Sequence, residues 1–294
     1  MNRTNSLKDL KTSLLRQYGQ KSPPKQEATP EQSNTTTSNS PIINANPQFS
    51  LQAEDPEPTC GSHSFLEHDR LPAAMREACL ASPQDTPTPD RRFDLGKMYP
   101  KRFRPKDIEC PRDGYVYLAC PGSRRKCPYH GVYVGHDDCF VIAIDGACSN
   151  NGKPDARGSI GVYCGDENAY NVSDILQLDE ERHTNQIAEL EACSQGLVVA
   201  MRIMKDRVAD GGMSFIFVIK SDSAYVVRGL TEWLPKWQKN GWMNSRGSPV
   251  ANAHLFQRIE GYVKVLETMG MVKFWLVPRT LNQDADKLAN NALK

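Results

Sequence analysis

The chain has 294 residues, with 36 Lys and Arg against 35 Asp and Glu, 39% hydrophobic residues and 9 cysteines. This composition excludes a fibrous protein and a disulfide-dense scaffold, and no apolar run approaches the roughly 18 residues of a membrane span, so no membrane partner is expected. The near-neutral total hides three segments: residues 1–90 carry 8 basic and 11 acidic side chains, residues 91–139 carry 11 and 6, and residues 140–294 carry 17 and 18. A polyanionic partner therefore stays open, because attraction to phosphates depends on where the charge lies.

Residues 1–90 are expected to form a disordered, low-complexity tail. Residues 20–52 are mostly Ser, Thr, Asn, Gln and Pro, which cannot bury enough apolar surface to offset the entropy of ordering. Ahead of them, leucines at helical spacing among basic residues favour a solvated, partly helical segment over a weak mitochondrial presequence. A short helix is expected over 65–80. An odd number of cysteines suits a reducing compartment, so the nucleus or cytoplasm is expected, with the mitochondrion as the alternative.

Residues 91–139 form a basic extension in which aromatic residues alternate with lysines and arginines. Such a mixture suits a nucleic-acid backbone. It equally suits a solvated surface whose aromatic residues pack on the following domain, so both interpretations stay open. The residues concerned are Lys97, Tyr99, Lys101, Arg102, Phe103, Arg104, Lys106, Tyr115, Tyr117 and Arg124 to Lys126.

The same extension contains two pairs of ligand-type residues, each separated by two positions. These are Cys127-Pro-Tyr-His130 and His136-Asp-Asp-Cys139. Two such pairs can close on one structural Zn²⁺, and the alternative is a set of scattered reduced thiols. The sequence thus offers a zinc site at Cys127, His130, His136 and Cys139 as a secondary hypothesis.

From residue 140 onward the pattern predicts one α/β domain. Residues 140–144 and 215–219 are uninterrupted apolar runs, typical of strands covered on both faces. Strands are also expected over 158–164, 169–178 and 272–277, and helices over 184–206, in a Trp-rich stretch, over 252–269 and at the C-terminus. The predicted order is β-β-β-α-β-α-α-β-α, and some 155 residues suffice for such a core.

Carboxylates follow both apolar strands, at Asp145 and Asp222. Ligand sites of open α/β sheets lie beyond the carboxyl ends of central strands, so these two side chains are expected to meet. The alternative is a turn residue and a helix cap. Two helices add candidates in pairs that periodicity does not separate: Glu189 or Glu191, and Asp284 or Asp286. Converging oxygen ligands suit Mg²⁺ or Mn²⁺.

The ordered motifs of the C-terminal half resemble type 1 ribonuclease H. They are Asp145-Gly146-Ala147-Cys148, Thr184-Asn185 with Glu189-Leu190-Glu191-Ala192, Ser221-Asp222-Ser223, the Trp233 to Trp242 stretch, and Asp286-Lys287-Leu288-Ala289. The resemblance implies a five-stranded mixed sheet flanked by helices over residues 140–294. It also implies that Asp145, Glu189, Asp222 and Asp286 are the catalytic, metal-binding carboxylates.

The activity implied by the resemblance is hydrolysis of the RNA strand of RNA–DNA hybrids by a two-metal mechanism with Mg²⁺ or Mn²⁺, leaving 3′-hydroxyl and 5′-phosphate ends. By the same resemblance, Asn185, Gln186 and Asn252 contact the hybrid, and the Trp-rich stretch corresponds to a region that grips the DNA strand. Core packing is the favoured role for at least two of its three tryptophans. The alternative for Asn185 is that it is a plain residue at the N-terminus of a helix.

One departure from the family concerns the loop before the last helix, where a histidine is usual. Residues 277–283 contain no histidine, and Arg279 is the one charged residue there that can reach a phosphate. An arginine binds phosphate but does not accept a proton near neutral pH, so slow turnover is expected. The alternative roles of Arg279 are a plain surface charge and a salt bridge to Asp284.

Two functional alternatives stay open for the whole chain. One is a catalytically weak or inactive nucleic-acid-binding adaptor, and the other is a nuclease acting on another duplex. The chain is assumed to be a monomer.

Overall fold

A computed structural model describes residues 90–128, 131–177, 183–208 and 215–294. The tail, the expected helix over 65–80 and His130 lie outside the described residues. The described strands are β1 (Glu109–Arg112), β2 (Tyr115–Ala119), β3 (Gly135–Ser149), β4 (Arg157–Tyr163), β5 (Val172–Ile175), β6 (Phe215–Ser221) and β7 (Gly270–Leu276). The described helices are α3 (Leu95–Met98), α4 (Asn185–Val208), α5 (Ala224–Arg228), a π-helical segment (Gly229–Trp233), α6 (Leu234–Lys239), α7 (Ala253–Leu266) and α8 (Gln283–Ala292), with 3-10 turns at Pro105–Asp107 and Arg279–Leu281.

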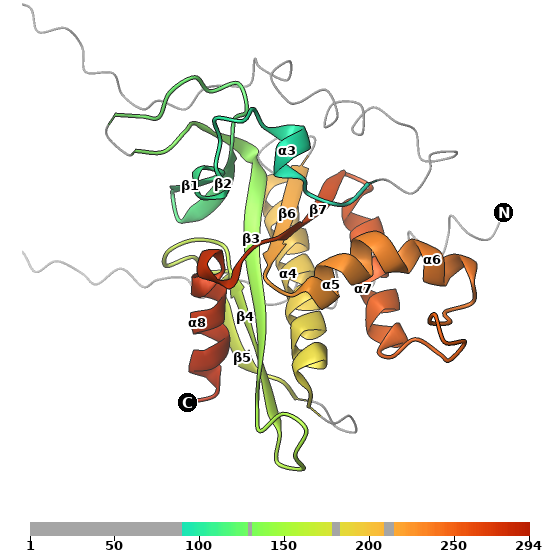
Figure 1. Ribbon diagram of the computed structural model, residues 1–294. Coiled ribbons are helices and arrows are strands. Elements are labelled where there is room, and N and C mark those ends of the chain that lie inside the picture. The colour runs from blue at the N-terminus through green and yellow to red at the C-terminus, as the bar shows by residue number, and fades with distance from the viewer. Residues whose placement is uncertain (1–89, 129–130, 178–182, 209–214) are drawn as a thin grey trace, which may run out of the picture. The chain divides into compact units, whose positions relative to one another are not determined.

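The predicted α/β order is confirmed from β3 to α8, and it forms a mixed sheet flanked by helices (Figure 1). Strand β3 is the centre of this sheet. It pairs antiparallel with β4 and parallel with β6, and β4 and β6 pair in turn with β5 and β7. These five strands are the ones that the sequence predicts.

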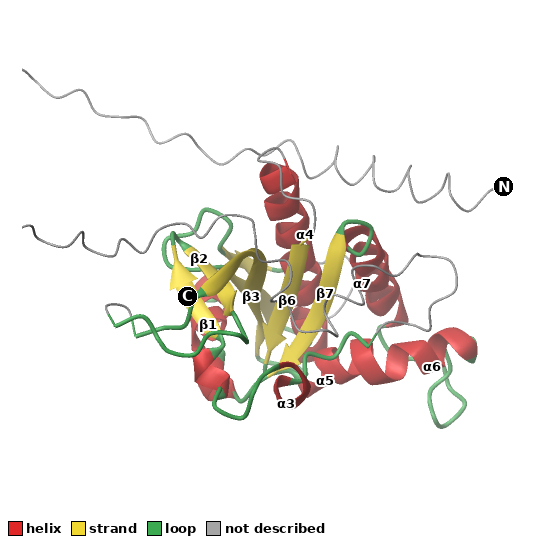
Figure 2. Cartoon of the chain, turned by 90° about the horizontal axis from the view of Figure 1, so that it is seen from above, coloured by secondary structure: helices red, strands yellow, loops and turns green. Residues whose placement is uncertain are grey.

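The sheet is covered on both faces, as the two apolar runs predict. All seven residues of β6 are buried. Figure 2 shows α4 and α7 on one face of the sheet, and α3 and α8 on the other. Helix α8 packs on β3, β4 and β5, so a different element has to cover this face over β6 and β7.

The extension supplies that cover and adds two strands that the sequence did not predict. The β1–β2 hairpin pairs with the N-terminal half of β3, with Tyr117 opposite Phe140. Strand β6 occupies the other edge of β3 at Phe140, so β2 lies on the same edge as β4 and continues its line. The sequence pattern does not reveal these short strands, because Pro111 and Arg112 interrupt β1 and β2 has only five residues.

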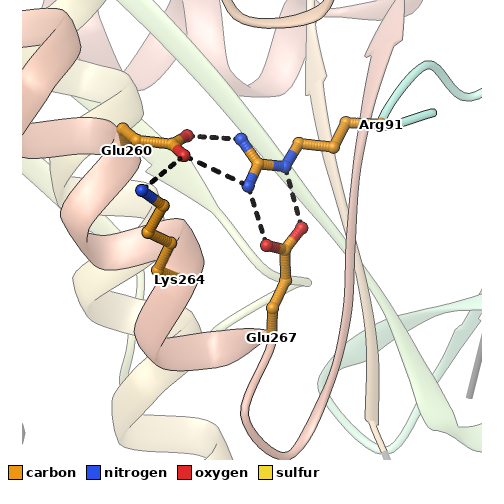
Figure 3. Close-up of polar contacts among 4 residues, drawn as sticks. All are labelled: Arg91, Glu260, Lys264 and Glu267. Atoms are coloured by element: carbon orange, nitrogen blue, oxygen red, sulfur yellow. Dashed lines mark hydrogen bonds and ion pairs between the residues drawn. The ribbon is translucent and has the colours of Figure 1, made fainter. Parts of the chain in front are cut away.

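At the opposite edge of the sheet, the start of the extension runs parallel to β7. The backbone N–H of Phe93 donates to the Phe274 carbonyl at 2.9 Å, and the N–H of Phe274 donates to the Arg91 carbonyl at 2.8 Å. The Arg91 guanidinium is buried and binds two carboxylates, Glu260 of α7 and Glu267 just after it (Figure 3). The extension is therefore fastened to both edges of the sheet.

Between these two attachments the extension packs its aromatic residues on the uncovered face. The Phe93 ring lies 5.1 Å from that of Trp275, and Tyr99 and Phe103 are buried in the same core. Lys220, the register partner of Trp275 in β6, is 5% exposed and donates to Glu109 of β1 at 2.6 Å. The aromatic residues of the extension thus pack in the core, whereas most of its cations, with the exception of Arg91, face solvent.

In the Trp-rich stretch, α5, the π-helical segment and α6 run without a break. Trp237 and Trp242 are partly buried and pack against the core, and Trp237 contacts the Phe256 ring of α7 at 5.1 Å. The core packing expected for at least two of the tryptophans is therefore confirmed in part, because both side chains pack on the core but stay partly exposed.

In the described ranges no helix combines the length and apolarity that crossing a membrane requires.

Candidate active site

Two carboxylates come together because β3 and β6 are parallel neighbours. The register pairs Ala143 with Lys220, and Asp145 and Asp222 each follow two residues after this pair. Asp145 lies within the long strand β3, whereas Asp222 follows the last residue of β6. The sheet therefore holds both carboxyl groups at one level on adjacent strands.

Two glycines beside Asp145 let a helix approach from each face. A Cβ on Gly146 would lie 2.2 Å from the Ala188 carbonyl carbon of α4, and a Cβ on Gly161, the register partner of Asp145, would lie 2.2 Å from the Ala285 carbonyl oxygen of α8. Neither contact is compatible with a side chain. These close approaches bring the carboxylates of α4 and α8 to Asp145.

On α4 the structure separates Glu189 from Glu191. Glu189 accepts a hydrogen bond from Ser223 Oγ at 2.5 Å and one from Asn185 Nδ2 at 2.8 Å, which turns it toward the end of β6. Glu191 forms an ion pair with Arg258 of α7 at 2.5 Å. Glu189 thus lies with the two aspartates, and Glu191 has a role in helix packing.

On α8 a similar choice separates Asp284 from Asp286. The Asp286 side chain is 25% exposed and pairs with Arg279, whereas that of Asp284 is 54% exposed and pairs with Lys287 at 3.2 Å. Arg279 therefore forms its salt bridge with Asp286, and the alternative partner considered from the sequence, Asp284, is wrong. Asp286 and Arg279 lie next to the aspartates of the sheet.

The proximity of these groups is visible in the electrostatics of Asp145. Burial is the main cause that raises the pKa of Asp145 to about 8, and the charges of Asp222, Asp286 and Glu189 raise it further against the opposing effect of Arg279. Burial likewise raises the pKa of Glu189, although its hydrogen bond from Ser223 acts in the other direction. The four carboxyl groups thus form one cluster of mutually repelling charges.

A cluster of this kind fits a divalent cation, because oxygen-only donors with unbalanced negative charge are the ligands that Mg²⁺ and Mn²⁺ prefer. Within the described ranges, no three His, Cys, Asp or Glu side chains are arranged to hold a metal ion as they stand. At this site the carboxylates are turned to protein partners instead: Glu189 to Ser223, Asp222 to Asn282 and Asp286 to Arg279. A cation would have to draw them away from these partners.

The sequence profile of the RNase H family matches residues 137–294, more than half of the chain. The chain belongs to the RNase H family. Human Ribonuclease H1 is 33% identical over 184 residues, which are 61% of this chain and 56% of the human protein. Ribonuclease H of Stutzerimonas stutzeri (strain A1501) is 32% identical over 160 residues, 53% of this chain and 93% of that protein.

Among solved structures, the crystal structure of LC11-RNase H1 in complex with an RNA/DNA hybrid aligns with 52% of this chain and 94% of its own, at 21% identity and a TM-score of 0.36. The matched region spans about half the length of the mammalian relatives, 56% of the human protein and 52% of the mouse protein. Residues 91–136 precede the family match and yet belong to the same folded unit as the RNase H domain.

The proposed substrate-binding residues lie around this cluster. Asn185 and Gln186 are exposed in the first turn of α4, and the helix is capped by Thr184, whose Oγ1 accepts from the Ile187 N–H at 3.2 Å. Asn185 is thus the first residue of α4, as its alternative role states, and its Nδ2 also donates to Glu189. Asn252 has a left-handed backbone, with φ of 56°, and its Nδ2 donates to the Tyr225 hydroxyl at 3.2 Å.

Asn282 is a site residue that the sequence reasoning missed. It is 1% exposed, and its Nδ2 donates to the Ile144 carbonyl at 2.9 Å and to Asp222 Oδ1 at 3.2 Å. Its own carbonyl accepts from the Asp286 N–H at 3.1 Å. One side chain thereby links β3, the end of β6 and the start of α8. Its position four residues before Asp286, at the start of the last helix, was the available signal.

The zinc hypothesis stays a prediction, because His130 lies outside the described residues. His136 has a partner that the hypothesis did not include, namely Cys120. Burial raises the pKa of the Cys120 thiol, but the neighbouring His136 imidazole, together with the backbone N–H groups of Gly122 and Ser123, outweighs this effect, and the net shift is downward. Cys110, Cys120, Cys148, Cys164 and Cys193 are free thiols.

Proposed function

We propose that this chain is a metal-dependent endonuclease that hydrolyses the RNA strand of RNA–DNA hybrids. The supporting observation is the meeting of Asp145, Glu189, Asp222 and Asp286 from four separate elements in a domain of the RNase H family. The proposal includes two Mg²⁺ or Mn²⁺ ions held by these carboxylates. When bound, such ions stabilise the charge on the attacking and leaving oxygens of an in-line displacement.

The protein groups position the hybrid and the phosphate. A water oxygen bonds to phosphorus as the bond to the 3′ oxygen breaks, which leaves a 3′-hydroxyl and a 5′-phosphate. The amides of Asn185, Gln186 and Asn252 donate to and accept from 2′-hydroxyls and base edges of the minor groove. Arg279 binds the phosphate oxygens, and Asn282 keeps Asp222 and α8 in register with β3.

The loop before α8 favours a second candidate function, a catalytically weak or inactive binding protein with the same fold. It contains no histidine, and Arg279 is already engaged with Asp286. The experiment described next also distinguishes a nuclease that acts on another duplex from these two functions.

The test is cleavage of end-labelled duplexes by the full chain with Mg²⁺ or Mn²⁺. The substrates are an RNA–DNA hybrid, duplex RNA and duplex DNA. Helix α8 offers a matched pair of variants, Asp286→Asn and Asp284→Asn. The first should lower kcat on the hybrid by at least about a hundredfold, since changes in the outer shell of metal sites alone typically cost 10- to 100-fold. The second should stay within about twofold, because Asp284 is exposed and paired with Lys287.

Asp145→Asn and Asp222→Asn should abolish hybrid cleavage. Equal activity of the Asp284→Asn and Asp286→Asn variants would contradict the assignment of the site. A correctly folded protein that cuts no hybrid with either ion would leave the binding protein as its function. Cleavage confined to duplex RNA or duplex DNA would establish the other nuclease.

A further inference from the structure

The exposed cations of the extension gather on two segments that precede the RNase H match. Between residues 101 and 126 there are eight basic and three acidic residues. The basic patch comprises the exposed side chains Lys101, Arg102, Arg104 and Lys106 of the first segment, and Arg124 and Arg125 of the second. Figure 1 shows α3 and the loop after β2, to which these segments connect, at the same end of β3.

Specific hydrogen bonds hold the two segments side by side. Arg102 Nη2 donates to the carbonyl oxygens of Pro121 and Ser123 at 2.9 and 2.8 Å. Asp107 is buried between the segments and binds Arg104 at 3.0 Å and Lys126 at 2.6 Å. These contacts lower the pKa of Asp107 well below its ordinary value, that with Arg104 first and that with Lys126 second. The patch therefore has a defined backbone framework.

The cations of the patch lie close together and have few counter-charges. Some exposed basic residues on the helices are paired with carboxylates, as in Arg228 with Glu232 and Lys287 with Asp284. In the described part of the chain, Lys101, Lys106, Arg124 and Arg125 form no ion pair. Bringing like charges together without counter-charges costs free energy, which an anionic partner would recover.

We propose that the basic patch binds the phosphate backbone of a nucleic-acid duplex, without sequence preference and without divalent metal. Arginine forks match phosphate oxygens, and a fixed framework limits the entropy lost on binding. A membrane surface fits less well, because interfacial binding also needs an apolar face, and among the described residues Val134 is the one exposed large apolar residue of the extension. This inference goes beyond the proposed nuclease activity, since the patch contains none of the four carboxylates of the candidate active site.

The test is fluorescence anisotropy of a labelled 20-base-pair RNA–DNA hybrid titrated with the full chain in EDTA, at several salt concentrations. The patch variant Lys101→Ala/Lys106→Ala/Arg124→Ala/Arg125→Ala should bind at least about tenfold more weakly at 0.1 M salt. Its plot of log K against log salt should become shallower by about 0.9 for each phosphate that the variant no longer neutralises. A charge-preserving variant, Lys101→Arg/Lys106→Arg/Arg124→Lys/Arg125→Lys, should keep the slope of the unmodified chain.

A variant with Lys205→Ala and Lys294→Ala removes two exposed cations outside the patch and should bind normally. An Arg124→Ala/Arg125→Ala variant matches it in charge and should bind more weakly. Binding of duplex DNA should depend on the patch in the same way as binding of the hybrid, and this dependence should appear in EDTA whether or not the chain proves to be a nuclease. Unchanged affinity and salt slope in the patch variant would overturn the proposal. So would patch-dependent binding to phosphatidylserine vesicles by a chain that does not bind nucleic acid.

Discussion

Arg91 offers the sharpest test of how the extension is joined to the RNase H domain. Its side chain is 5% exposed, and its guanidinium lies between Glu260, which is 8% exposed, and Glu267 (Figure 3). The change Arg91→Ala removes the cation and leaves a buried carboxylate. The neighbouring Arg92 is a matched control, because it pairs with Glu232 at 3.2 Å, where the two side chains are 33% and 42% exposed.

The expected cost follows from what remains after each substitution. Breaking a buried ion pair by removing one partner typically costs about 3–5 kcal/mol, because the other charge stays buried without compensation. Lys264 still pairs with Glu260 at 3.3 Å, so we expect the lower end, about 3 kcal/mol. The exposed pair of Arg92 contributes about 0–1 kcal/mol. The two adjacent arginines should therefore differ several-fold in their effect on the free energy of unfolding.

Equilibrium unfolding in urea measures this difference. With a slope of about 2 kcal/mol per molar urea, Arg91→Ala should lower the midpoint by about 1.5 M, and Arg92→Ala by less than about 0.5 M. Adding Glu260→Gln and Glu267→Gln to Arg91→Met should recover much of the loss, because no buried charge then remains unpaired. Equal shifts for Arg91→Ala and Arg92→Ala would refute the idea that the extension is clamped through a buried charge.

Three further predictions concern the acidic cluster. Gly146→Ala should lower the free energy of unfolding by several kcal/mol and reduce hybrid cleavage, because the new methyl group forces α4 and Glu189 away from β3; urea unfolding and kcat measure the two effects. Asn282→Asp places a second charge beside Asp222, so kcat should fall by more than tenfold, whereas unchanged kinetics would remove Asn282 from the positioning role. In EDTA, Asp145 has a pKa of about 8 in the folded chain and about 3.9 in the unfolded chain, so the folded form binds its proton more tightly. The free energy of unfolding should therefore fall as pH rises from 4 to 8. The Asp145→Asn variant should be a few kcal/mol more stable than the unmodified chain at pH 8 but not at pH 4.

Much of the domain was predictable because its signals are local. The buried runs of β3 and β6 are apolar at every position, and α7 repeats its apolar residues at helical spacing, so element type and order follow from neighbours in sequence. The β1–β2 hairpin was missed because its strands are four and five residues long and contain a proline and charged residues. Its stability comes from pairing with β3, which no local pattern reports.

The choice between paired carboxylates shows what sequence spacing leaves open. Glu189 and Glu191 flank the buried stripe of α4 symmetrically, and so do Asp284 and Asp286 on α8. Which member meets Asp145 depends on how each helix lies against the sheet: Glu191 faces Arg258 of α7, and Asp284 is exposed beside Lys287 of its own helix. Family resemblance selected the same members, but the physical reason is in the packing of the helices.

The amino-acid sequence by itself determined the order of strands and helices, the burial of the two central strands and the set of acidic candidates, since each depends on residues close together along the chain. The tertiary structure alone decided that the extension belongs to the sheet, with Arg91 buried and most of its other cations exposed. That result depends on pairs such as Arg91 with Glu267, which are 176 residues apart. Contacts at such a separation are set by the geometry of the whole sheet, because no local periodicity encodes which distant side chains meet.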